Sequence, residues 1–114
     1  MMSDYPNKSS FQSWVTDLQL IATGAPSGHR ILSKCLDVAG MLINKNISYG
    51  DSALTPIRVF SKADNLEQIK VRIDDKLNRI VNSEAYPGDN DIDDLIGYLI
   101  LLKIAVDKNG NSGV

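Results

Sequence analysis

Cysteine and histidine are almost missing from this 114-residue chain, which has one of each. A lone cysteine cannot form an internal disulfide, so we expect a reducing compartment. One cysteine and one histidine do not supply the ligands of the usual zinc sites, and nothing in the sequence supports a catalytic triad through His29. Cys35 lies in an apolar helical pattern and is predicted to be a buried core thiol. His29 stands at a predicted helix start, where we expect an exposed or capping side chain.

Long apolar runs and an excess of positive charge are missing as well. The longest apolar stretch, residues 95–106, contains Lys103 and is shorter than the about 20 residues that a membrane span needs, which predicts a buried helix and no membrane contact. Residues 1–10 are polar and lack the apolar core of a signal peptide, so we expect a cytoplasmic protein. The formal net charge of −2 argues against binding of long nucleic acid, whereas a single nucleotide needs only a few local cations. No glycine-rich phosphate loop of the Walker or dinucleotide type is present.

Helical periodicity fills most of the chain instead. Apolar side chains recur every three or four residues in four segments, which we predict as helices over residues 11–23, 29–46, 64–80 and 91–107. Thr55 and Pro56 predict the start of a fifth, short helix that extends to residue 61. No convincing period-two strand pattern appears. We therefore expect an all-α, single-domain bundle of four to five helices over residues 1–114, with flexible ends of about eight and about seven residues.

An acidic stripe marks the beginning of the last predicted helix. Asp91, Asp94 and Tyr98 share one face of this helix, and Asp93 lies beside them. Acidic residues in a first turn favour the positive end of the helix dipole without any ligand, which is one explanation for Asp91 and Asp93. Asp94 lies deeper in an apolar helix, where an unpaired carboxylate is costly. We therefore predict that Asp94 meets a cation, a metal ion or several hydrogen-bond donors.

Charged residues on the preceding predicted helix are the expected partners of this stripe. Arg72, Asp75 and Arg79 lie one above another on that helix. One interpretation is a solvated ladder of ion pairs without a ligand. The other is that the two helices pack antiparallel, so that Asp75 or Asp74 approaches Asp94. Converging carboxylates suit Mg²⁺, and an arginine suits a phosphate group.

The segment YGDS at residues 49–52 ends a long predicted helix and has two open interpretations. It is an ordinary turn, because Gly50 accepts positive φ and Asp51 and Ser52 are turn formers. Alternatively, the ring of Tyr49 stacks on a base while the Asp51 carboxylate bonds to a sugar or a base edge. The sequence does not decide between the two.

Three strings together resemble a small phage and prophage domain associated with nucleotide modification: KNISYGDS at residues 45–52, RIDDKLNRI at 72–80 and DLIGYL at 94–99. The resemblance covers residues 41–104. That domain is distantly similar to the all-α nucleoside triphosphate pyrophosphohydrolases of the MazG type. Those enzymes bind Mg²⁺ through Glu-x-x-Glu on one helix and Glu-x-x-Asp on another. Here Asp91 and Asp94 have the spacing of the second motif, with Asp in place of Glu, and the first motif has no counterpart.

The resemblance implies a phage-type nucleotide-binding protein that is either a Mg²⁺-dependent pyrophosphohydrolase or a relic of one. In such a site Asp75, Asp91 and Asp94 hold Mg²⁺. The nucleotide is bound by six further side chains: Tyr49, Asp51, Arg72, Lys76, Arg79 and Tyr98. An alternative that also follows from the resemblance is a non-catalytic anti-defence protein in the bacterial host cytoplasm, which sequesters a cyclic or other signalling nucleotide or inhibits a host defence protein.

A third interpretation is structural and does not require a ligand. A small helical module with an almost wholly apolar helix needs a partner to cover side chains such as Trp14, Phe60 or Leu101. A second copy of the chain would supply that cover, so we expect a homo-oligomer. The charged stripes would then only maintain solubility.

Overall fold

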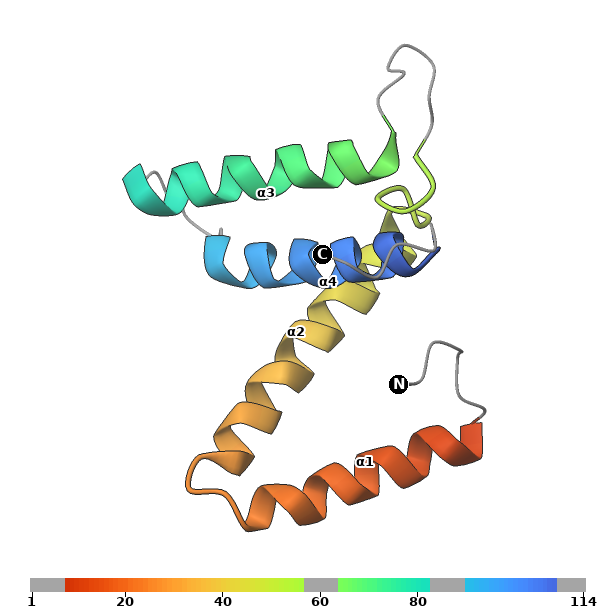
Figure 1. The fold of residues 1–114 in the computed structure, drawn as a ribbon, viewed down its shortest axis with the longest axis vertical. Coiled ribbons are helices and arrows are strands. Elements are labelled where there is room, and N and C mark those ends of the chain that lie inside the picture. The colour runs from red at the N-terminus through yellow and green to blue at the C-terminus, as the bar shows by residue number, and fades with distance from the viewer. Residues whose placement is uncertain (1–7, 57–63, 83–89, 109–114) are drawn as a thin grey trace. The chain divides into compact units, whose positions relative to one another are not determined.

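The computed structural model describes residues 8–56, 64–82 and 90–108, and in these residues the chain is helical without a strand. Four helices follow one another: α1 (Lys8–Thr23), α2 (Gly28–Ser48), α3 (Asn65–Asn82) and α4 (Asp91–Lys108) (Figure 1). The prediction of an all-α chain with four helices is confirmed. The short helix expected up to residue 61 and the two expected flexible ends lie outside the described residues. None of the four helices reaches the length and apolarity that crossing a membrane requires.

Polar side chains fix where α3 and α4 begin. The amide of Glu67 donates a hydrogen bond of 2.8 Å to the Asp64 carboxylate, as the sequence predicts for a helix start. At the start of α4, the amide of Asp93 donates to the Asn90 side-chain oxygen at 3.1 Å, and the Asn90 side-chain nitrogen donates back to the Asp93 carboxylate at 2.9 Å. Each cap satisfies amides that have no partner inside the helix. The register of every later residue on these helices follows from the two caps.

Contacts divide the chain into two compact units, Met1–Gly40 and Met41–Val114, and α2 contributes to both. In unit 1, a short turn joins α1 to α2, with hydrogen bonds from the Gly24 amide to Ile21 and from the Gly28 amide to Ala25. Gly28 lies against the backbone of Ala22, and a Cβ at Gly28 would stand 2.7 Å from the Ala22 Cα. This glycine therefore permits the close approach. That the two units form one domain stays a prediction.

Few described residues of unit 1 are buried. Ala22 and Gly28 are buried where the turn brings α1 and α2 together, and Val38 is buried further along α2. Cys35 is exposed, so the prediction of a buried core thiol is wrong. The physical reason is that two helices can enclose only the residues facing each other, and the apolar spacing of α2 extends beyond that face. Trp14 is half-exposed on α1, next to Phe11 at a ring-centroid distance of 6.5 Å.

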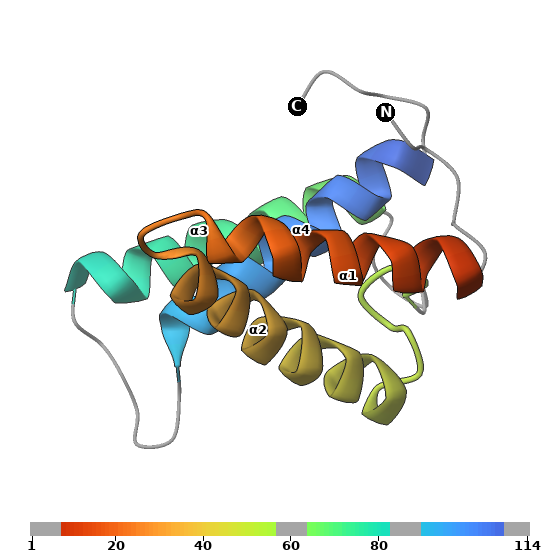
Figure 2. The same ribbon diagram turned by 90° about the horizontal axis from the view of Figure 1, so that it is seen from below.

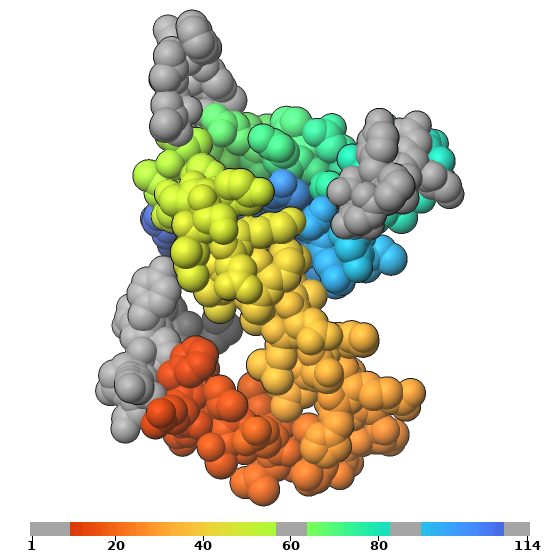
Figure 3. Space-filling model, turned by 180° about the vertical axis from the view of Figure 1, so that it is seen from behind, coloured from red at the N-terminus to blue at the C-terminus, as the bar shows by residue number. Residues whose placement is uncertain are grey.

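Unit 2 contains the main cluster of buried apolar side chains. Helices α3 and α4 run antiparallel and side by side, as one of the two interpretations of the sequence supposed (Figures 1 and 2). Ile69 of α3 packs against Leu101 and Ala105 of α4. Figure 3 shows the end of α2 and the loop after it covering these helices, and Leu42 and Leu54 from this segment pack against the cluster.

The prediction of a homo-oligomer depends on three side chains that a partner copy would cover. Leu101 is buried within its own unit and needs no partner for cover. Phe60 lies outside the described residues, and Trp14 is half-exposed. Homo-oligomerisation therefore stays a prediction, and Leu101 no longer supports it.

Candidate functional site

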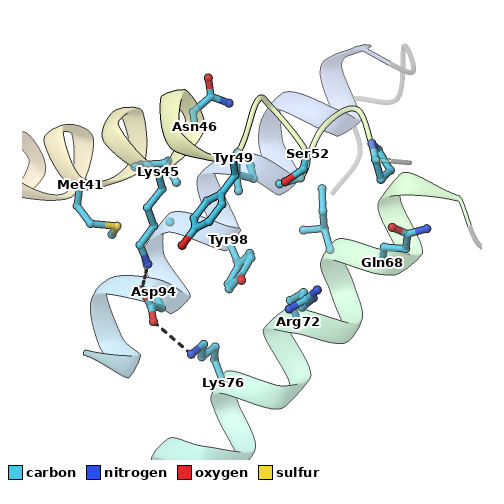
Figure 4. Close-up of a pocket in the computed structure, with 16 residues that line it drawn as sticks. Met41, Lys45, Asn46, Tyr49, Ser52, Gln68, Arg72, Lys76, Asp94 and Tyr98 are labelled. Atoms are coloured by element: carbon cyan, nitrogen blue, oxygen red, sulfur yellow. Dashed lines mark hydrogen bonds and ion pairs between the residues drawn. The ribbon is translucent and has the colours of Figure 1, made fainter. Parts of the chain in front are cut away.

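A cleft of about 710 Å³ opens in unit 2 between the end of α2, the loop after it, and the facing sides of α3 and α4 (Figure 4). Its volume lies within the range of roughly 300–1,000 Å³ that is usual for small-molecule sites. Apolar residues of the core form part of the wall, and polar and charged side chains form the rest. The polar and aromatic lining consists of Lys45, Asn46, Tyr49, Ser52, Gln68, Arg72, Lys76, Asp94 and Tyr98.

Helical spacing explains why these side chains meet. Each of the three helices contributes two lining residues that are four positions apart, and residues at this spacing lie on the same face of a helix. Because the three faces converge on one cleft, charged groups and aromatic rings stand in it together. The pairs are Lys45 and Tyr49 on α2 and just beyond its end, Arg72 and Lys76 on α3, and Asp94 and Tyr98 on α4.

The carboxylate of Asp94 bridges two lysines from different helices. Its Oδ1 lies 2.9 Å from the Lys45 Nζ, and its Oδ2 lies 3.2 Å from the Lys76 Nζ (Figure 4). The side chains of Asp94 and Lys76 are only 17% and 16% exposed, whereas that of Lys45 is 49% exposed. The prediction that Asp94 meets a cation is confirmed. The two ion pairs also join α2, α3 and α4 around the cleft.

Asp91 extends this network of ion pairs away from the cleft. Its Oδ1 lies 3.4 Å from the Lys76 Nζ and 3.1 Å from the Arg79 Nε, and its side chain is 8% exposed. Asp91 and Arg79 do not line the cleft. The predicted roles of Asp91 as a metal ligand and Arg79 as a phosphate ligand therefore have no support from the position of these side chains. Their pairing instead connects the first turn of α4 to the end of α3.

The ion pairs shift the pKa values of Asp94 and Lys76 in opposite directions. Burial alone would raise the pKa of Asp94, but hydrogen bonds from Lys45 and Lys76 and their positive charges hold it below the ordinary value of 3.8. Burial alone would lower the pKa of Lys76, but the hydrogen bonds and charge of its carboxylate partners Asp94 and Asp91 raise it above 10.5. Both side chains are thus charged at neutral pH.

The lowered pKa of Asp94 makes part of the stability dependent on pH. A carboxyl group with a lower pKa in the folded state stabilises the fold above its unfolded pKa, and this contribution is lost as the pH falls below 3.8. We expect Asp94→Asn to lower the free energy of unfolding by about 1–2 kcal/mol at neutral pH, because both partners keep some contact with water. In urea unfolding of the wild-type chain and the variant, the difference between their free energies of unfolding should decrease as the pH falls below 3.8. A difference that stays constant down to acidic pH would contradict the prediction.

Among the described cations that line the cleft, Arg72 is the one without a carboxylate partner. Within the described parts of the chain, its guanidinium makes no hydrogen bond or ion pair, and its side chain is exposed at the cleft. Figure 4 shows it in the same opening as the rings of Tyr49 and Tyr98. An unpaired guanidinium next to two aromatic rings can bind an anionic group while a planar ring stacks beside it. Of the predicted nucleotide ligands, Tyr49, Arg72, Lys76 and Tyr98 are thus brought together.

Asp51 is not part of this opening. Gly50 and Asp51 have φ of 60° and 63°, so the chain turns sharply after Tyr49. The Asp51 carboxylate then accepts hydrogen bonds from the Asn46 side-chain nitrogen at 2.8 Å and from the Thr55 hydroxyl at 3.1 Å. These bonds hold the loop in place behind Tyr49. The predicted contact of Asp51 with a nucleotide would have to compete with them.

The predicted magnesium ligands do not come together. Asp75 is exposed on α3 and does not line the cleft. Over the ranges that the structure describes, no three Asp, Glu, His or Cys side chains are grouped so that they could hold a metal ion. Asp91 and Asp94 are instead bonded to lysine and arginine side chains. The binding of Mg²⁺ stays a prediction, and the positions of these carboxylates do not support it.

Sequence reasoning overlooked Lys45 as a member of the site. Lys45 precedes Tyr49 by four residues, and the Tyr49 amide, just beyond the end of α2, still donates a hydrogen bond to the Lys45 carbonyl, so the two share a face. That spacing was a usable signal, because it places a cation next to the aromatic residue already singled out. Gln68 also lines the cleft and precedes Arg72 by the same four residues on α3, whereas Ser52 lines it without such a pattern.

Comparison of the chain with protein-family models, with curated proteins and with solved structures finds no match. The resemblance of three strings to a phage domain therefore stays a prediction, as do the pyrophosphohydrolase activity and the anti-defence role that it implies.

Proposed function

We propose that the cleft of unit 2 binds a nucleotide and does so without chemical turnover. The observation that carries the proposal is the unpaired guanidinium of Arg72 in the same cleft as Tyr49 and Tyr98. The guanidinium offers paired N–H groups that match the oxygens of a phosphate. The tyrosine rings offer a stacking surface for a base and a hydroxyl at its edge. Each half of a nucleotide thus has a suitable contact within one opening.

Binding is favoured over hydrolysis by the state of the carboxylates. Asp94, the only acidic residue lining the cleft in the described part of the chain, is bonded to Lys45 and Lys76. Pyrophosphate release by the metal-dependent route needs several carboxylates to hold Mg²⁺ near the phosphates. Here the lining is positively charged overall, which attracts an anion directly. Sequestering of a nucleotide, the alternative implied by the resemblance to a phage domain, requires only this binding.

The proposal predicts that Arg72 determines affinity while a neighbouring cation does not. Arg72→Met should weaken binding by about ten- to a hundredfold, because a charge-assisted hydrogen bond to the phosphate is lost. Lys70→Met is the matched control: Lys70 lies on the same helix, is exposed and does not line the cleft. Isothermal titration calorimetry with the 5′-monophosphates of the common nucleosides, in buffer with EDTA, measures both variants. Equal losses in the two variants, or no binding to the wild-type chain, would contradict the proposal.

A further inference from the structure

The charges that line the cleft do not balance. Among the described residues that line it, three side chains are cations, Lys45, Arg72 and Lys76, and one is a carboxylate, Asp94. Asp91, the other carboxylate in contact with Lys76, lies outside the lining and is itself paired with Arg79 at 3.1 Å. The cleft therefore has a surplus of two positive charges, although the chain as a whole has a net charge of −2. A ligand of matching charge would leave neither an unpaired cation nor an unpaired anion in the cleft.

We infer that the cleft selects a nucleoside monophosphate, bound as the phosphomonoester dianion without a divalent metal ion. This inference rests on the proposed function and specifies its ligand. A phosphomonoester has a charge of about −1.5 to −2 at neutral pH, because its second pKa is about 6. A cyclic nucleotide is a phosphodiester with a single charge and would leave one cation unmatched. A triphosphate carries more negative charge than the lining can compensate and would need a metal ion.

The arrangement of the charges supports the same ligand. Arg72 and Lys76 are one helical turn apart on α3, so both can reach the oxygens of one phosphate. Beyond Lys76, the Asp94 carboxylate stands between the two lysines, with its oxygens 2.9 and 3.2 Å from their Nζ atoms (Figure 4). A second or third phosphate extending in that direction would meet this negative charge. Asp94 thus limits the ligand to one phosphate group.

The pH dependence of binding distinguishes the dianion from other ligands. The charged and titratable groups that face the phosphate position are Lys45, Arg72, Lys76, Asp94, Tyr49 and Tyr98. None of these residue types ordinarily changes charge near pH 6, and no histidine lines the cleft. A change of affinity through pH 6 therefore reports the second ionisation of the ligand. A monophosphate should lose about tenfold in affinity between pH 7 and pH 5, and a cyclic nucleotide should not change.

The experiment is calorimetric titration of the full chain with four ligands that share the best-binding base: the nucleoside, its cyclic monophosphate, its 5′-monophosphate and its 5′-triphosphate. Each is measured in EDTA and in excess Mg²⁺. We expect the 5′-monophosphate to bind about tenfold more tightly than the others, with no effect of Mg²⁺. Tighter binding of the triphosphate, a requirement for Mg²⁺, or equal pH profiles for the cyclic and linear monophosphates would overturn the inference. These results would leave nucleotide binding intact, whereas no binding by any ligand would overturn the proposed function itself.

Asp94→Asn tests the limit to one phosphate. Removing this charge should tighten binding of the triphosphate more than that of the monophosphate and narrow the difference between them to less than about threefold. Circular dichroism establishes that the variant is folded under the conditions of the titration. An unchanged preference in the folded variant would overturn this role of Asp94. If the variant does not fold, the ligand and pH series on the wild-type chain still decide the inference.

Discussion

Asp91→Asn should destabilise unit 2 by about 2–3 kcal/mol, because it breaks a largely buried pair of ion contacts between α3 and α4. The Asp91 side chain is 8% exposed and forms ion pairs with Lys76 and Arg79. Removing one partner of a fully buried pair typically costs about 3–5 kcal/mol. We expect less here, because Lys76 keeps its contact with Asp94. Urea unfolding followed by circular dichroism measures the free energy of unfolding.

Asp93→Asn is the matched control for this prediction. Asp93 stands in the same first turn of α4 and accepts a hydrogen bond from its neighbour Asn90 at 2.9 Å. Both substitutions remove one negative charge near the positive end of the helix dipole, which is typically worth about 0.3–1 kcal/mol. Only Asp91 is bonded to α3. Equal losses of stability in the two variants would show that the dipole, and not the interhelical pairing, accounts for the effect.

Gly28→Ala should destabilise unit 1 by about 2–3 kcal/mol, because the added methyl group collides with the backbone of α1. Its Cβ would stand 2.7 Å from the Ala22 Cα, and a backbone cannot move aside as a flexible side chain can. Accommodating the methyl group requires the two helices to separate at their turn. The chain has one tryptophan, Trp14, and it lies on α1, so its fluorescence during urea unfolding reports on unit 1.

Gly40→Ala is the matched control and should have the opposite sign. Gly40 lies in the same helix, and a Cβ there would meet no atom within 4 Å. Alanine is favoured over glycine inside a helix by about 0.5–1 kcal/mol, because glycine loses more backbone freedom on folding. We therefore expect a gain in helix stability of this size by circular dichroism. Destabilisation by both substitutions would contradict the explanation through the Ala22 contact.

The helices were predictable because their signals are local. Asp64 and Glu67 have the spacing of a helix N-cap, and the Glu67 amide donates to the Asp64 carboxylate at the start of α3. The exposure of Cys35 was not predictable in the same way. An apolar helical pattern gives the faces of a helix, but it does not say whether another element covers each face. The exposure of Cys35 is a property of the packing of unit 1 and not of α2 alone.

The candidate site was predictable in part for the same reason. Spacing along single helices singled out Asp94 with Tyr98, which both line the cleft, and Arg72 with Asp75 and Arg79, of which only Arg72 lines it. Lys76 was expected at the site only from the resemblance, and it lies there one helical turn after Arg72. The partners of Asp94 were not predictable, because Lys45 reaches it from a helix 49 positions away in sequence. Similarly, a carboxylate such as that of Asp51 can bind a sugar or a base edge, but here its two oxygens accept hydrogen bonds from neighbouring residues of the chain.

The position of Asp94 between two lysines constrains how the ligand specificity of such a cleft can evolve. A substitution of Asp94 would admit more heavily charged ligands but would at the same time remove the bonds to Lys45 and Lys76 that join three helices. Arg72 makes no such bond within the described chain, so its replacement changes which ligand binds without breaking a bond between helices. A substitution of Arg72 that favours a new ligand therefore costs little stability. A substitution of Asp94 changes specificity at the expense of stability.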